Sequence, residues 1–152
     1  MTEKAVFAGG CFWGVEYYFQ KVPGVVSTQV GYTGGAAFDR QCGPTYDDVC
    51  AGGSGYFEVL EVTYDPMLVS YEELAKLFFS IHDFSQRNGQ GSDVGSQYRS
   101  AIFYLNDAQK KIAEKLISDL SGRGYSVATG LKPAEQFWPA EEYHQNYFDV
   151  FY

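Results

Sequence analysis

Cys11 is the residue of this sequence best placed for nucleophilic chemistry. It follows Gly9 and Gly10, where a short apolar segment ends and a helical pattern begins. Backbone N–H groups and the positive end of the helix dipole favour a thiolate at a helix N-terminus. Phe12 and Trp13 come next and provide an apolar face beside the sulfur. An inert buried thiol is the other common fate of a lone cysteine, so position alone leaves both interpretations open.

Other residues whose side chains could take part in a reaction have ordinary structural explanations. Glu16 lies on the same predicted helix as Cys11, where a lone carboxylate is more often solvated or a cap than an acid catalyst. His144 stands in an aromatic segment and is more typical of a satisfied structural histidine. His82-Asp83 has the character of a pair that anchors a loop.

The elements that must position these groups follow from hydrophobic spacing and from turn and capping residues. We expect strands at residues 4–8, 24–32, 57–64, 99–105 and 125–129, and helices at 11–21, 70–82, 107–120 and 139–148. Through the fourth strand the order is β-α-β-β-α-β, the ferredoxin-like split βαβ pattern. The predicted fold class is α+β, a two-layer α/β sandwich with this core, long loops at 31–55 and 83–97, and a C-terminal aromatic helix.

Length and charge limit the classes of function. The 152 residues fit one domain, and 45% hydrophobic residues are enough for a folded core. A net charge of −8 is opposite in sign to what phosphate contacts need, so we expect no nucleic-acid partner. The sequence has no apolar run of about 20 residues and no signal-peptide core near its first residue, so we expect a cytoplasmic protein without a membrane partner.

The stretch Gly10-Cys11-Phe12-Trp13-Gly14-Val15-Glu16 resembles the signature of the A-type peptide methionine sulfoxide reductases. Further motifs of that family follow in the family's order across nearly the whole chain. They are Gly31-Tyr32-Thr33-Gly34-Gly35, Pro44-Thr45-Tyr46, Gly55-Tyr56-Phe57-Glu58, His82-Asp83, Gln90-Gly91, Asp93, Gln97-Tyr98-Arg99-Ser100 and Ala140-Glu141-Glu142-Tyr143-His144-Gln145.

The resemblance implies a monomeric, cofactor-free and metal-free thiol reductase of S-methionine sulfoxide, free or in exposed protein segments. Reduction of a sulfoxide needs a soft nucleophile at sulfur and an acid at oxygen. By resemblance, Cys11 attacks the sulfur and becomes a sulfenic acid, and Glu58 holds the proton, which requires burial to raise its pKa. Tyr46 and Tyr98 match the family tyrosines whose hydroxyls bind the sulfoxide oxygen.

The resemblance also assigns the substrate pocket. Phe12 and Trp13 would receive the substrate methyl group and help to select the sulfoxide epimer. Asp93 matches a family aspartate that orients water or polar groups of the substrate. Without the resemblance, Glu58 reads as an outward residue of an alternating strand.

The chain departs from the family pattern at its recycling cysteines. Many members carry them after the Tyr-His-Gln segment, whereas this sequence has no cysteine after Cys50. Cys42 lies in a tract that is longer than usual, four residues before Tyr46, and we expect it to form a disulfide with Cys11 that a thioredoxin-like reductant opens. The alternative is a one-cysteine enzyme that an external thiol reduces directly. A second departure is Tyr56-Phe57, where the family often has His-Ala.

Three other classes stay open at this point. A cysteine hydrolase would pair Cys11 with His144 or His82 as base and Asp93 as orienter. A non-catalytic binding module would account for the 18% aromatic residues. A zinc site has ligand types in Cys11, Cys42, Cys50 and His144, but their spacing is not diagnostic.

Overall fold

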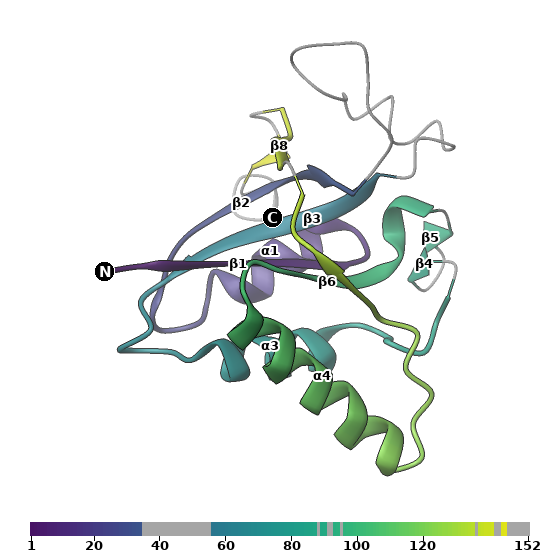
Figure 1. The fold of residues 1–152 in the computed structure, drawn as a ribbon. Coiled ribbons are helices and arrows are strands. Elements are labelled where there is room, and N and C mark those ends of the chain that lie inside the picture. The colour runs from purple at the N-terminus through teal and green to yellow at the C-terminus, as the bar shows by residue number, and fades with distance from the viewer. Residues whose placement is uncertain are drawn as a thin grey trace.

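The computed structural model describes residues 1–34, 56–87, 89–90, 93–94, 96–135, 137–141 and 144–145. The strands of its main sheet are β1 (Glu3–Gly9), β2 (Val25–Thr33), β3 (Phe57–Tyr64), β6 (Ser100–Tyr104), β7 (Gly130–Pro133) and β8 (Trp138–Pro139). They stand side by side in the order β7-β6-β1-β3-β2-β8 (Figure 1).

The four central strands form the predicted split βαβ core. β1 pairs antiparallel with both β3 and β6, and β3 also pairs antiparallel with β2. The resulting order β6-β1-β3-β2 is that of a ferredoxin-like sheet. β1 lies between β6 and β3, so both of its edges are paired, and its run from Ala5 to Gly9 is buried throughout. The predicted α+β class is therefore confirmed.

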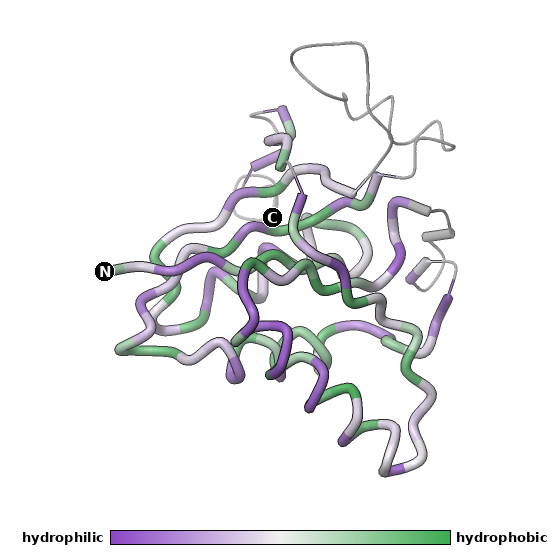
Figure 2. The backbone as a smooth tube through the Cα atoms, viewed as in Figure 1, coloured by the Kyte–Doolittle hydropathy of each residue, from purple (hydrophilic) through white to green (hydrophobic). Residues whose placement is uncertain are grey.

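Three described helices pack on one face of this sheet. They are α1 (Phe12–Phe19), α3 (Tyr71–Ile81) and α4 (Asp107–Gly122). Side-chain caps begin α3 and α4: the Ser70 hydroxyl accepts the Glu73 N–H, and the Asn106 side chain accepts the Gln109 N–H. Figure 2 shows hydrophobic residues concentrated along the central strands, whereas the first turns of α4 are hydrophilic. The helices thus cover the sheet with their apolar faces.

The opposite face of the sheet has its own smaller core. Alternate residues of β1 point to opposite faces, so Phe7 packs in the helix-side cluster while Val6 belongs to the second cluster. Phe57 and Phe103 meet edge to face in that second cluster, with ring centroids 5.3 Å apart. Partly buried Phe137, from the segment that leads into β8, packs against it.

The C-terminal third differs from the sequence prediction. The strand expected at 125–129 is found instead as β7 at Gly130–Pro133, parallel to β6. The aromatic helix expected from residue 139 does not begin there, because Trp138–Pro139 form β8 against β2. A residue before proline favours an extended backbone, which suits an edge strand. Residues 142–143 and 146–152 lie outside the described residues, as do 35–55 of the first predicted loop.

The second predicted loop contains short elements. They are β4 (Gly89–Gln90), β5 (Asp93–Val94) and the 3₁₀ turn η1 (Ser96–Tyr98). β4 and β5 pair with each other, and η1 packs against β3 and β4. Across the part of the chain that the structure covers, no helix has both the length and the apolar character to cross a membrane.

Candidate active site

Cys11 occupies the turn between β1 and α1, as predicted. It is the N-cap residue of α1, its carbonyl accepts the N–H groups of Gly14 and Val15, and its side chain is partly exposed. Gly10 before it has φ +96°, and a Cβ there would lie 2.7 Å from Cγ of Gln90. Only glycine fits both the backbone angle and the space. The Cys11 thiol is therefore held at the N-terminus of a helix, and the backbone of the preceding Gly10 packs against Gln90.

A hydrogen-bonded loop supports this turn. The Gln90 amide donates to the Asp83 carbonyl at 2.6 Å and accepts the Asp83 N–H at 2.7 Å. His82, the residue before, places Nδ1 2.6 Å from the Phe78 carbonyl and Nε2 2.6 Å from the Ser100 hydroxyl. Burial lowers the pKa of His82. The loop-anchoring interpretation of His82-Asp83 is therefore confirmed.

Glu58 lies beside the residue that follows Cys11. It sits on β3 opposite Tyr32 of β2 and is only 1% exposed. Its Oε1 accepts the backbone N–H of Phe12 at 3.3 Å, the first N–H of α1. Glu58 shares its side of β3 with Leu60, on the face that the helices cover, so it does not point outward as strand alternation alone suggested. A buried carboxyl group and a helix-capping thiol thus meet at one helix N-terminus.

Phe12 and Trp13 begin α1 and form an aromatic group with residues from other segments. The Phe12 ring is 1% exposed and lies 5.6 Å from the Tyr32 ring and 6.3 Å from the Trp13 ring, centroid to centroid. The indole N–H of Trp13 donates to Nδ1 of His144 at 3.1 Å. This arrangement places apolar ring surface beside Cys11.

His144 is 2% exposed, although it lies in the C-terminal segment. Its Nε2 is 3.2 Å from Oε2 of Glu141, and its ring centroid is 5.6 Å from that of Phe12. Burial lowers the pKa of His144, and the neighbouring Glu141 carboxylate opposes that effect. Sequence reasoning identified a structural histidine here but missed its contact with Trp13.

Tyr98 and Asp93 lie on elements close to Glu58 and Cys11. Tyr98 ends η1, which packs against β3, and the next residue, Arg99, lies over the Phe57 ring at 4.4 Å. The backbone of Asp93 pairs with that of Gln90, which itself contacts the turn before Cys11. Three other residues of interest, Tyr46, Cys42 and Cys50, lie outside the described residues.

Glu16 is buried rather than solvated. It is 1% exposed, and its Oε2 accepts the Thr28 hydroxyl at 3.0 Å. Thr28 in turn accepts the Gln20 amide at 3.3 Å. Phe12, Glu16 and Phe19 have the i, i+4, i+7 spacing of one helix face, which is the buried face of α1. This spacing in the sequence could have predicted that Glu16 is buried.

Comparison with known proteins agrees with this geometry. The family model for peptide methionine sulfoxide reductase matches residues 3–150. The chain belongs to this family. A peptide methionine sulfoxide reductase MsrA from Nautilia profundicola is 53% identical over 145 residues, covering 95% of this chain and 82% of the relative.

Two solved structures extend the comparison. Mxr1 from Saccharomyces cerevisiae in reduced form superposes with a TM-score of 0.94 at 37% identity, covering 99% of this chain and 86% of the other. Mxr1 in complex with Trx2 gives a TM-score of 0.66 at 26% identity, covering 96% and 84%. As a member of the peptide methionine sulfoxide reductase family, the chain is an oxidoreductase that reduces methionine sulfoxide at the expense of thiols.

The described contacts of the two histidines do not favour a cysteine hydrolase. The chain has two histidines, and both are described. The ring nitrogens of His82 contact Phe78 and Ser100, and those of His144 contact Trp13 and Glu141. Each ring is therefore engaged with groups other than Cys11. The zinc alternative needs Cys42 and Cys50, which lie outside the described residues.

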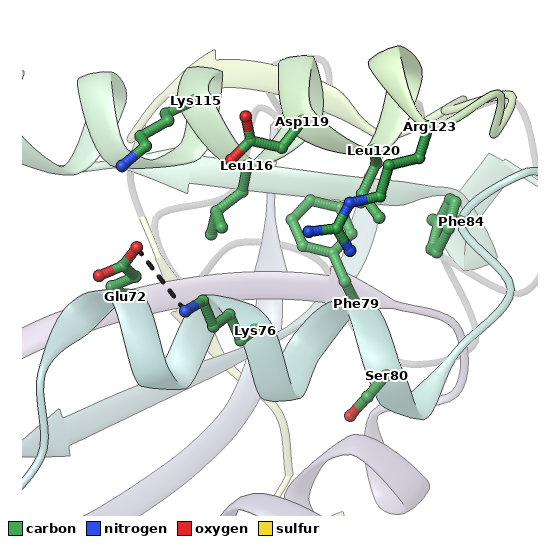
Figure 3. Close-up of a pocket in the computed structure, with 10 residues that line it drawn as sticks. All are labelled: Glu72, Lys76, Phe79, Ser80, Phe84, Lys115, Leu116, Asp119, Leu120 and Arg123. Carbon is green, nitrogen blue, oxygen red and sulfur yellow. Dashed lines mark ion pairs between the residues drawn. The ribbon is translucent and has the colours of Figure 1, made fainter.

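A large groove of the described structure lies away from this chemistry. It has a volume of about 570 Å³ and runs between α3 and α4 (Figure 3). Phe79 and Leu116 contribute apolar surface, while Lys76 pairs with Glu72 at its rim. None of its lining residues comes from α1 or β3. In this peptide methionine sulfoxide reductase the groove is thus separate from the Cys11 turn.

Proposed function

We propose that the Cys11 thiolate attacks the sulfur of S-methionine sulfoxide while Glu58 protonates its oxygen. The oxygen atom passes from the substrate sulfur to the cysteine sulfur, which leaves methionine and a Cys11 sulfenic acid. The observation that carries this proposal is the bond from the Phe12 N–H to Oε1 of Glu58, which brings a 1% exposed carboxyl group to the residue after Cys11. Burial favours the neutral, proton-donating form of a carboxyl group.

The pocket around these two groups selects the substrate. Phe12 and Trp13 receive the methyl group on apolar ring faces, and the ring contacts of Phe12 with Tyr32 support this role. Tyr98 binds the sulfoxide oxygen together with Tyr46, and Asp93 orients polar groups. The packing of η1 on β3 and the pairing of Asp93 with Gln90 support the placement of Tyr98 and Asp93.

Regeneration takes two further thiol steps. Cys42 attacks the Cys11 sulfenic acid, a disulfide forms, and water leaves. A thioredoxin-like dithiol then reduces the disulfide and becomes oxidised itself. The resemblance to Mxr1, whose structure in complex with Trx2 is known, supports this partner. Direct reduction of the sulfenic acid by an external thiol is the alternative, and it applies if Cys42 does not resolve Cys11.

A single-turnover experiment tests both steps. Pre-reduced protein is mixed with excess S-methionine sulfoxide without reductant, and released methionine and intact protein mass are measured for the wild type, Cys42→Ser and Cys50→Ser. We expect one equivalent of methionine, loss of two hydrogens in the wild type and in Cys50→Ser, and gain of one oxygen in Cys42→Ser. The R epimer serves as the control that releases nothing.

Other outcomes are equally informative. A folded wild type that releases no methionine overturns the proposed reaction. If Cys42→Ser still loses two hydrogens while Cys50→Ser gains oxygen, Cys50 is the resolving thiol. If the wild type itself gains one oxygen, no disulfide has formed within the protein, and an external thiol reduces the sulfenic acid directly.

We further propose that residues 1–152 act as one monomeric domain in the cytoplasm. The continuous sheet that joins β1 to β8 supports a single unit. Size-exclusion chromatography with light scattering tests the monomer, and cell fractionation tests the compartment.

A further inference from the structure

The ring of His144 meets the indole of Trp13 as a hydrogen-bond acceptor. Indole nitrogen only donates, so the histidine nitrogen that faces it at 3.1 Å must carry no proton. The two rings lie within 26° of parallel, with centroids 5.5 Å apart. The contact therefore joins the ring edges and fixes the rotation of the indole about its side-chain bonds.

The surroundings of His144 favour this one protonation state. A neutral imidazole has one donor and one acceptor nitrogen. With Nδ1 accepting from Trp13, the proton lies on Nε2, which faces the Glu141 carboxylate at 3.2 Å. Phe12 and Trp13 contribute no charge from the α1 side, and 2% exposure disfavours the imidazolium. Protonation of Nδ1 would set two N–H groups against each other and break the bond.

The peptide that carries His144 is itself fixed to the sheet. The Gln145 side chain donates to the Val30 carbonyl at 2.9 Å and accepts the Val30 N–H at 2.8 Å. The Ala140 N–H also donates to Val30, and the His144 N–H donates to the Glu141 carbonyl. These bonds hold the ring of His144 against α1 from the edge of β2.

We propose that neutral His144 is a positioning residue that holds the Trp13 indole in place as a wall of the substrate pocket. The inference rests on the proposed function, in which Trp13 receives the substrate methyl group. It assigns His144 no contact with the reacting atoms. His144 acts by keeping Trp13 in its binding orientation before the substrate arrives, which reduces the ordering cost of binding.

A double-mutant cycle tests the coupling in a Trp138→Phe background, where Trp13 is the only tryptophan. His144→Phe keeps a ring but removes the acceptor, and Trp13→Phe removes the donor. We expect His144→Phe to raise KM for S-methionine sulfoxide roughly fivefold, which corresponds to about 1 kcal/mol, with kcat nearly unchanged. In Trp13→Phe, which itself raises KM, the added His144→Phe change should have little further effect.

A conservative variant separates this role from a merely structural one. The asparagine of His144→Asn keeps a hydrogen-bond acceptor, its amide oxygen, which does not titrate. KM near neutral pH should therefore be close to the wild-type value. Wild-type KM should rise as the pH falls below 6.5 and His144 takes up a proton, and Trp13 fluorescence should change over the same range. Both changes should be absent in His144→Asn.

The outcomes distinguish failure of this inference from failure of the proposed function. If the wild-type protein releases no methionine in a single turnover, the proposed function fails, whereas Trp13 fluorescence in the Trp138→Phe protein still reports its coupling to His144. If methionine is released and Trp13→Phe raises KM, but His144→Phe leaves KM and Trp13 fluorescence unchanged, the positioning role is overturned. Additive effects of the two substitutions would overturn it as well.

Discussion

Replacement of Glu58 by glutamine tests the acid role with little change in shape. The buried side chain keeps an oxygen that accepts the Phe12 N–H, so the start of α1 should remain in place. The variant cannot donate a carboxylic proton to the sulfoxide oxygen. Loss of a general acid typically costs about 10²- to 10⁴-fold in rate, which is about 3 to 5 kcal/mol of barrier.

The assay is methionine release in a single turnover from pre-reduced protein, which isolates the first chemical step from recycling. Thermal unfolding of the same samples checks the fold. Glu61→Gln is the matched control, because Glu61 lies on the same strand but pairs with Lys4 at the surface at 3.4 Å. That pair contributes under about 1 kcal/mol to stability, so the control should react at the wild-type rate.

One result would refute the acid role. If Glu58→Gln melts like the wild type and releases methionine within about threefold of the wild-type rate, the proton comes from elsewhere. If the variant is slow but also unfolds at a much lower temperature, Glu58→Asp provides the second test. It keeps the acid but shortens the side chain, so partial activity would show that the carboxyl group itself matters.

Three further predictions concern the framework. Gly10→Ala should lower the free energy of unfolding by about 1 to 3 kcal/mol in urea titrations, because φ is +96° and the new Cβ would press on Gln90. Ser70→Ala should cost about 1 kcal/mol by the same titration, because it removes the N-cap of α3. Burial lowers the pKa of His82 below its ordinary 6.5, so the unfolded chain binds the proton first as the pH falls. The contribution of His82 to the free energy of unfolding should thus be complete above about pH 6.5 and decline below it. The His82→Asn variant has no titrating group beside Ser100, so its melting temperature should fall less between pH 7 and pH 5.

The central fold was predictable because its signals are local. The alternation at 57–64 gave β3 with its observed bounds, and the capping residues before α3 and α4 gave their first turns. β7 was predicted five residues too early, because Gly130–Pro133 has no alternation and pairs only through a parallel neighbour. β4 and β5 have two residues each, too few for any periodic pattern.

The candidate site was only partly predictable. The turn at Cys11 followed from Gly9 and Gly10, which are adjacent in sequence. Glu58 was assigned through resemblance, because strand alternation says which residues share a face but not which face a helix covers. His144 and Trp13 are 131 residues apart, so their hydrogen bond could not be read from spacing.

His144 and Trp13 are brought together by the contacts that β8 and Gln145 make with the edge of β2. A Cβ at Gly31 would collide with the Trp138 carbonyl, so glycine lets β8 approach β2 closely. Past β8, the Gln145 amide bonds to both backbone groups of Val30, as a neighbouring strand would. A side chain that substitutes for backbone leaves no strand pattern in the sequence. Residues 144–145 are therefore held at the edge of β2, and His144 connects that edge to the Phe12 and Trp13 rings beside Cys11.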